Sequence, residues 1–303
     1  MVVQLACAVT LPPAFRADDI LAFHRRDAQE IAERVTDTAL HKGMIWAGRP
    51  ACLTIAFSDG IAHAALAVDG TATEGQLAFE TLVHRLLGLG QNIAAFENSY
   101  RDHPQIGVLI AQNPGLRVPV TTTPFEALTW AITGQQISVK AAVSLRRKLI
   151  LATGIRHSSG LFCYPEAHQI AALTVDAIRQ TGYSMTKAQT MHQLSRQIAE
   201  GALPLDEWAT TPATPLAMDD IRARLLAVKG IGPWTVSYAL LRGFGWLDGS
   251  LHGDVAVRRG LQKLQHSEEP IDEAQTRDWL EPFSPWRALI AAHLWALQST
   301  TAY

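Results

Sequence analysis

The stretch that decides the fold reads Leu225-Leu-Ala-Val-Lys-Gly-Ile-Gly-Pro-Trp-Thr-Val-Ser-Tyr-Ala-Leu240. A helical apolar pattern ends near Val228, two glycines follow, and Pro233 suits the first turn of a new helix. The pattern predicts a helix, a tight hairpin and a second helix. Because Gly230 and Gly232 permit positive φ and close approach, the hairpin amides and the second helix N-terminus would form an anion site that fits a DNA phosphate. A helical corner closed by a glycine cap is the alternative interpretation of this stretch alone.

A second informative stretch follows, Gly243-Phe-Gly-Trp-Leu-Asp-Gly-Ser-Leu-His-Gly-Asp-Val-Ala-Val-Arg-Arg259. Its glycines predict a long irregular loop, and Asp254 stands where the next helix begins. Helix capping alone would account for an aspartate at that position. The segment around Ser250 is not a hydrolase nucleophile elbow, because that motif needs glycine two residues before the serine and Asp248 stands there.

Together, the Gly-Ile-Gly hairpin and an aspartate about twenty residues after it resemble the helix–hairpin–helix DNA glycosylase superfamily. Gly134-Gln-Gln-Ile-Ser138 resembles the Gly-Gln-x-x-Ser segment of bacterial 3-methyladenine DNA glycosylase II. Pro285-Trp-Arg-Ala288 and His293-Leu-Trp295 resemble the C-terminal signature of that family, and Pro114-Gly-Leu-Arg117 and Thr186-Lys-Ala188 extend the match. The resemblance covers the whole chain and is least specific at its N-terminal end.

The resemblance implies that Asp254 is the catalytic carboxylate, which would stabilise positive charge on the sugar once the target base has been flipped out of the duplex. Trp234, Tyr238 and Trp295 would wall the base pocket by stacking and cation–π attraction, with core packing as the alternative for each. Glycosylases that also cut the strand carry a lysine two residues after the second glycine. This chain has Trp234 there, so we expect base removal without strand cleavage.

Gln135 and Gln136 stand where the family inserts a wedge into the vacated base stack. The best-known pattern has an apolar residue at the second position, so contact with the opposite base is the alternative for Gln136. Two further departures concern substrate range: Gly253 precedes the aspartate where acidic or proline-containing sequence is common, and Ala296 stands where an aromatic residue can occur.

Contacts with DNA phosphates are expected from several basic side chains and from the hairpin backbone. These are Lys229, Gly230, Gly232, Lys140, Lys187 and Arg258, with Arg146 and Arg259 as further candidates. A solvated helix face is the alternative for each side chain. The family also implies that the carbonyl groups of Leu226, Val228 and Ile231 bind a structural Na⁺ or K⁺ ion. No cofactor is expected to be required.

The composition agrees with a globular protein: 303 residues, 48% hydrophobic, 18% charged and a net charge of −2. Residues 134–163 contain basic but no acidic side chains, and residues 222–263 contain only two acidic ones, so a local basic face is expected. Three widely spaced cysteines disfavour disulfides, zinc sites and iron–sulfur clusters. With no membrane-length apolar run and no signal peptide, we expect a cytoplasmic bacterial protein that reaches the nucleoid through DNA. A monomer without an obligate protein partner is the default expectation.

The order of patterns predicts an α+β fold, with a small antiparallel-sheet α/β domain before a mainly α-helical body. Residues 1–112 would form the first domain, whose last helices, about 73–112, would pack on the C-terminal helices, and residues 113–303 the glycosylase region with the active-site cleft. Strands are expected at residues 2–9, 51–57 and 61–68, the last two joined by a Ser-Asp-Gly turn. Helices are expected at residues 18–33, 74–87, 124–133, 137–151, 184–200, 221–228, 233–242 and 288–297.

The function expected from this resemblance is hydrolysis of the N-glycosidic bond of alkylated purines, of the 3-methyladenine and 7-methylguanine type, in double-stranded DNA. Three alternatives stay open. A glycosylase for deaminated or oxidised bases shares the fold. A non-catalytic helix–hairpin–helix DNA-binding protein would keep Gly230 and Gly232 but would not need Asp254. A metabolic hydrolase lacks a recognisable nucleophile elbow or metal set.

Overall fold

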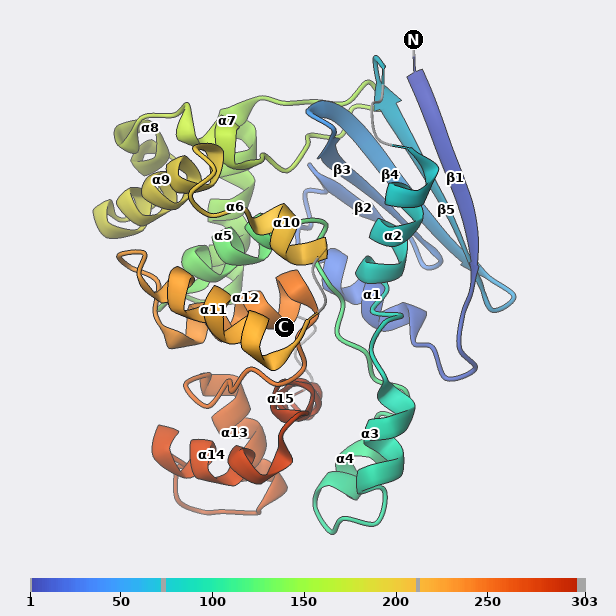
Figure 1. Cartoon of the computed structure of the whole chain (residues 1–303), viewed down its shortest axis with the longest axis vertical. Helices are drawn as coiled ribbons and strands as arrows, with labels where there is room; N and C mark the ends of the chain where they lie inside the picture. Colours follow the sequence, from blue (N-terminus) through green and yellow to red (C-terminus); the bar gives the residue numbers. More distant parts are fainter. Residues whose placement is uncertain (1, 72–74, 211–212, 299–303) are drawn as a thin grey trace.

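A five-stranded antiparallel sheet occupies the N-terminal end of the molecule (Figure 1). The computed structural model describes residues 2–71, 75–210 and 213–298. The strands are β1 (Val2–Thr10), β2 (Glu33–Val35), β3 (Ala39–Trp46), β4 (Arg49–Ser58) and β5 (Ile61–Asp69), in the order β1-β5-β4-β3-β2. The α+β architecture predicted from the sequence is confirmed.

The hairpin of β4 and β5 turns at the predicted Ser-Asp-Gly signal, where Asp59 and Gly60 both have positive φ, the backbone that tight hairpins favour. Its register places Leu53 opposite Leu66. Both leucines are fully buried, and helix α2 (Gln76–Leu86) packs on them through Phe79. The expected start of this helix at residue 74 lies outside the described residues.

The helix expected at residues 18–33 is wrong in length. Helix α1 covers only Ala17–His24, and Glu33 begins strand β2. Strand β3, which the sequence pattern does not predict, pairs with β2 and carries the fully buried Lys42. A strand is recognised in a sequence by alternating apolar residues, and the charged residues Glu33 and Lys42 interrupt that alternation. Both are buried because they form an ion pair with each other, which the sequence does not show.

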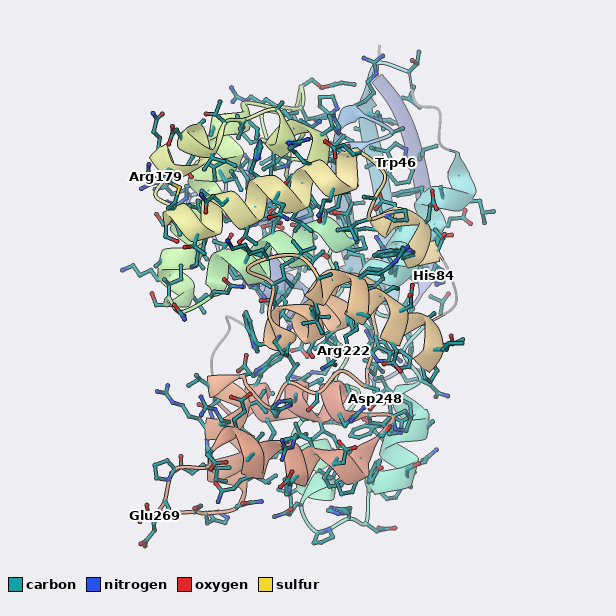
Figure 2. The ribbon with its side chains drawn as sticks, turned by 60° about the vertical axis from the view of Figure 1, so that its left-hand side comes forward. Trp46, His84, Arg179, Arg222, Asp248 and Glu269 are labelled. Carbon is teal, nitrogen blue, oxygen red and sulfur yellow. The ribbon has the colours of Figure 1, made fainter. Side chains whose placement is uncertain are left out.

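The rest of the chain is helical. The helices are α3 (Ile93–Tyr100), α4 (Ile106–Gln112), α5 (Pro124–Gly134), α6 (Val139–Thr153), α7 (Ala167–Ala171), α8 (Val175–Gln180), α9 (Met185–Ala199), α10 (Leu205–Thr210), α11 (Pro215–Leu226), α12 (Pro233–Phe244), α13 (Val255–Leu264), α14 (Glu273–Leu280) and α15 (Arg287–Ala296), with a 3₁₀ turn at Glu281–Phe283. Figures 1 and 2 show α3 and α4 beside α13–α15, at the end of the molecule away from the sheet. Phe96 of α3 and Leu109 of α4 share one hydrophobic cluster with Leu289 of α15, so the chain's N-terminal half completes the C-terminal core.

No helix in the described part of the chain has both the length and the apolar character needed to cross a membrane. Among the same residues, no three histidine, cysteine, aspartate or glutamate side chains are grouped so that they could hold a metal ion.

Candidate active site

The hairpin between α11 and α12 presents backbone donors at the surface. Gly230 has a φ of +89°, and a Cβ there would lie 2.0 Å from Oγ1 of Thr190, so both conformation and space require glycine. The same hydroxyl donates to the carbonyl of Lys229 at 3.1 Å and ties the hairpin to α9. Gly232 caps α12 and Pro233 occupies its first turn. Among the described residues no side chain caps this helix start, so its first N–H groups, next to the exposed Gly230, make a surface that favours an anion.

Asp254 is the N-cap of α13 and is only 5% exposed. Its Oδ1 accepts hydrogen bonds from the backbone N–H groups of Ala256 at 2.8 Å and Val257 at 3.1 Å. The capping interaction expected from sequence is therefore present. Capping uses one carboxylate oxygen and leaves Oδ2 for other partners.

Two tryptophans from distant helices donate to the same carboxylate. The indole Nε1 of Trp234, on α12, donates to Oδ2 of Asp254 at 2.8 Å, and Nε1 of Trp295, on α15, donates to Oδ1 at 3.2 Å. The two indoles and the two backbone amides are all donors, and the carboxylate oxygens of Asp254 accept from each of them. An N-cap needs no such indole partners. Their convergence on Asp254 fixes the orientation of the carboxylate from both sides.

The three aromatic residues expected at the base pocket lie next to one another. The ring centroids of Trp234 and Tyr238 are 5.6 Å apart, and those of Tyr238 and Trp295 are 6.4 Å apart. Tyr238 and Trp295 are 2% and 3% exposed, whereas Trp234 is half-buried. Trp234 therefore offers the accessible stacking face in this conformation, and the other two rings support it from behind.

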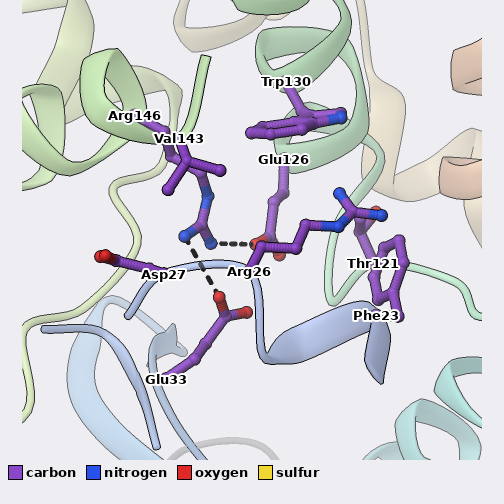
Figure 3. Close-up of a pocket in the computed structure, with 9 residues that line it drawn as sticks. All are labelled: Phe23, Arg26, Asp27, Glu33, Thr121, Glu126, Trp130, Val143 and Arg146. Carbon is purple, nitrogen blue, oxygen red and sulfur yellow. Dashed lines mark hydrogen bonds and ion pairs between the residues drawn. The ribbon is translucent and has the colours of Figure 1, made fainter. Parts of the chain in front are cut away.

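A stack of alternating aromatic and guanidinium groups ends at Trp295, and no motif in the sequence indicates it. The guanidinium of Arg26 lies 4.1 Å from the ring centre of Phe23 and 5.0 Å from that of Trp130 (Figure 3). On the other side, the guanidinium of Arg242 lies 4.7 Å from the same Phe23 ring and 5.5 Å from Trp295. The stack thus joins α1 of the sheet domain to the helix that holds Trp295.

Both guanidinium groups of this stack lie against aromatic rings, and Nε and one Nη of Arg26 and Nε of Arg242 are buried without a hydrogen-bond partner among the described residues. Neither Arg26 nor Arg242 forms an ion pair with any described residue, and Arg242 donates to the carbonyl of Pro119 at 3.1 Å. Burial lowers the pKa of Arg242 to about 10, so it stays charged at neutral pH. Aromatic faces attract cations most strongly where water is excluded, which accounts for two guanidinium groups at this position.

A cavity of about 270 Å³ opens beside Trp295. Its lining includes Phe23, Arg242 and Ala296. Ala296 is the residue at which the family can carry an aromatic side chain, so its small size contributes to this space. A second cavity, of about 30 Å³, lies between Phe23 and Trp130 and is drawn in Figure 3.

The basic residues expected at DNA phosphates divide into two groups. Lys140, Lys229 and Arg259 are exposed and Arg258 is half-buried, so these side chains are available at the surface. Arg146 is not available, because it is buried in ion pairs with Glu33 and Glu126 (Figure 3). Lys187 is also misassigned: its Nζ donates to the carbonyls of Thr133 and Gln135 at 2.8 and 2.6 Å.

Gln135 and Gln136, both expected at the wedge, have different surroundings in the structure. The side chain of Gln135 turns into the protein and donates to the hairpin, which contradicts the wedge expected at this residue. Gln136 is exposed and has a φ of +57°. Of these two glutamines, Gln136 is the one whose side chain could enter a DNA duplex.

The three hairpin carbonyls implied as cation ligands differ in whether they accept a hydrogen bond. The carbonyl of Val228 accepts a hydrogen bond from the N–H of Ile231 at 3.1 Å. Within the described residues, no hydrogen bond reaches the carbonyl oxygens of Leu226 or Ile231. Two oxygens at the hairpin thus have free lone pairs for a monovalent ion.

Residues 129–285 match the family model of the HhH-GPD superfamily of base excision DNA repair proteins. The chain belongs to this superfamily. Residues 8–123 match the AlkA N-terminal domain, so the resemblance drawn from the sequence is confirmed.

Relatives of this superfamily member include DNA-3-methyladenine glycosylase 2 of Escherichia coli, 29% identical over 192 residues that cover 63% of each protein. DNA-3-methyladenine glycosylase of Bacillus subtilis is 23% identical over 216 residues, which cover 70% of each protein. The chain spans 63% of the length of the first relative and 64% of another Bacillus subtilis relative, YfjP.

Solved structures share the fold. A 3-methyladenine DNA glycosylase from Archaeoglobus fulgidus superposes with a TM-score of 0.79 and 19% identity, over 97% of this chain and 98% of that one. An 8-oxoguanine glycosylase/lyase from Clostridium acetobutylicum reaches a TM-score of 0.71 at 12% identity, over 98% of both chains. Since enzymes with different names share this architecture, the fold does not select the lesion.

Proposed function

We propose that the protein is a DNA glycosylase that hydrolyses the N-glycosidic bond of alkylated purines, of the 3-methyladenine and 7-methylguanine type, in double-stranded DNA. The observation that carries the proposal is the carboxylate of Asp254, held by the indole N–H groups of Trp234 and Trp295. Such a fixed negative charge is what a reaction that develops positive charge on a sugar requires. The names of the curated relatives support the choice of substrate.

The reaction needs little acid catalysis from the protein. An alkylated purine carries positive charge and leaves as a neutral base, taking the electron pair of the C1′–N bond. Asp254 then stabilises the oxocarbenium-like sugar and orients a water molecule, whose oxygen adds to C1′ while its proton passes to the carboxylate or to solvent. The flipped base would stack on the accessible face of Trp234.

DNA would be held by groups that approach its phosphates from the hairpin side. The backbone at Gly230 and Gly232 provides donors at the start of α12, and Lys229 and Lys140 supply positive charge. A Na⁺ or K⁺ ion, when bound by the carbonyls of Leu226, Val228 and Ile231, would add positive charge at the same hairpin. These contacts carry no base information and fix only the register of the duplex.

The test is release of free base from duplex DNA treated with a methylating agent. We expect chromatography of the released material to show 3-methyladenine and 7-methylguanine in proportion to enzyme and time. DNA binding without release of any methylated purine would overturn the substrate assignment. Release of deaminated or oxidised bases alone would move the enzyme to another lesion class.

We also propose that the enzyme removes the base without cutting the strand. A lyase needs an amine nucleophile at the sugar, and position 234 carries a tryptophan whose N–H is bound to Asp254. We expect no covalent enzyme–DNA adduct when the reaction is run with borohydride, and intact abasic strands after base release. Trapping that disappears in Lys229→Ala, with Lys140→Ala as the matched lysine control, would show that Lys229 serves as a nucleophile instead.

The proposed partner is double-stranded DNA bound by a single protein chain. The proposed site of action is the cytoplasm of a bacterial cell, where its DNA lies.

A further inference from the structure

The loop between α5 and α6 exposes one glutamine in a left-handed conformation. Gln136 has a φ of +57°, which side chains with a Cβ adopt only where the surroundings impose it. The next residue, Ile137, is 38% exposed, and Ser138 caps the start of α6. The tip of this loop therefore projects a polar and an apolar side chain from a strained backbone.

The preceding residue, Gln135, ties this loop to the DNA-binding hairpin. Its Nε2 donates to the carbonyl of Gly230 at 3.1 Å and to Oγ1 of Thr235 at 2.9 Å. Gly230 is the hairpin glycine and Thr235 lies in the first turn of α12, about a hundred residues away in sequence. One amide group thus bridges the two surface features that would meet DNA.

Helix α9 forms hydrogen bonds with both the Gln136 loop and the hairpin. Lys187 donates to the carbonyls of Thr133 and Gln135, which closes the C-terminus of α5 at the base of the loop. One turn later, Thr190 donates to the carbonyl of Lys229 and packs against Gly230. Burial lowers the pKa of Lys187, because it removes water from the ammonium group.

We propose that Gln135 is a positioning residue that locks the Gln136 loop to the hairpin, so that phosphate binding at the hairpin sets the depth at which Gln136 enters the duplex. The inference rests on the proposed function, because it assumes that a base is flipped. It replaces the wedge role expected for Gln135 by a mechanical one. Four elements, α5, α6, α9 and the hairpin, then engage DNA as one rigid body.

The physical reason lies in the geometry that insertion demands. Opening a base pair costs a few kcal/mol, and a loop that yields under that load would lose its effect. A misplacement of about 1 Å can cost about 100-fold in rate when a reacting group must be positioned. The amide of Gln135 resists such displacement through two hydrogen bonds to the element that grips the phosphates.

The test compares Gln135→Met, which keeps the side-chain length and removes both donors, with Gln136→Ala and the double variant. Each protein is bound to duplex DNA that carries a tetrahydrofuran abasic analogue beside 2-aminopurine, whose fluorescence rises when it unstacks. We expect Gln135→Met to bind this DNA within about threefold of wild type, because the hairpin contacts remain. We expect it to lose most of the fluorescence rise, and to slow single-turnover excision of a paired lesion about tenfold or more.

The double variant distinguishes this positioning role from a general structural one, because it shows whether the effects of the two substitutions depend on each other. If Gln135 acts through Gln136, the double variant is no slower than Gln136→Ala alone. Excision of a lesion opposite an abasic site, where less unstacking is needed, should fall several-fold less than excision of a paired lesion. Additive losses, or equal losses on both substrates, would overturn the proposal. Fluorescence does not depend on chemistry, so wild-type unstacking without release of methylated bases would refute only the proposed function.

Discussion

Asp254→Asn is expected to lower single-turnover release of methylated purines by about 100-fold or more, the loss typical when one preorganised electrostatic group is removed. The neutral amide cannot balance positive charge on the sugar. Its oxygen can still cap α13 by accepting from Ala256 and Val257, since asparagine is an effective N-cap. Its NH₂ group then faces the N–H of Trp234, so one favourable contact becomes a meeting of two donors.

The matched control for Asp254→Asn is Asp272→Asn, at the exposed N-cap of α14. Both variants remove one negative charge from a helix start, but only one of them lies between the two indoles. We expect binding of undamaged duplex to stay close to wild type in both variants. Only Asp254→Asn should unfold at a lower temperature, because it loses the contact with Trp234. Base release that survives in Asp254→Asn would contradict a catalytic role for Asp254 and leave it as a helix cap alone.

The hairpin and the aspartate could be predicted because their causes are local. Gly230 needs positive φ, Pro233 suits a first helical turn and Asp254 suits an N-cap, and each rule acts within a few residues. The start of the hairpin's first helix, α11, was predicted wrongly. That helix begins at Pro215, with Thr214 as its cap, although apolar spacing suggested a start near residue 221.

The rest of the site could not be predicted because its contacts join distant segments. Phe23, Arg26 and Arg242 meet only after α1 packs beside α12 and α15, and no spacing along the chain announces that meeting. The assignment of basic residues to DNA phosphates was wrong in two places for the same reason. Arg146 and Lys187 have the composition of phosphate contacts, yet each is committed to acceptors within the protein.

A buried cluster of four charges joins the sheet to the helices that carry this site. Nζ of Lys42, on β3, lies 2.6 Å from Glu33 of β2 and 2.7 Å from Glu126 of α5. Arg146 of α6 pairs with the same two carboxylates at 3.1 and 2.9 Å. Burial alone would raise the pKa of Glu126, but Lys42 and Arg146 outweigh it and lower this pKa from 4.5 to about 2. The pKa of Glu33 is held well below its ordinary value by the same two cations, against the effect of burial.

Lys42→Met should therefore lower the free energy of unfolding by about 3–5 kcal/mol at pH 7, because two buried carboxylates are left with one cation. Folding lowers the pKa of Glu126, so its stabilising contribution is complete above about pH 4.5 and is lost as the pH falls toward 2. Denaturant unfolding at pH 7 and pH 3 should thus give a smaller difference between variant and wild type at the lower pH. Arg196→Met, which breaks the exposed 2.6 Å pair with Glu200, should cost less than about 1 kcal/mol. A Lys42→Met protein as stable as Arg196→Met would show that the cluster does not hold the sheet to the helices.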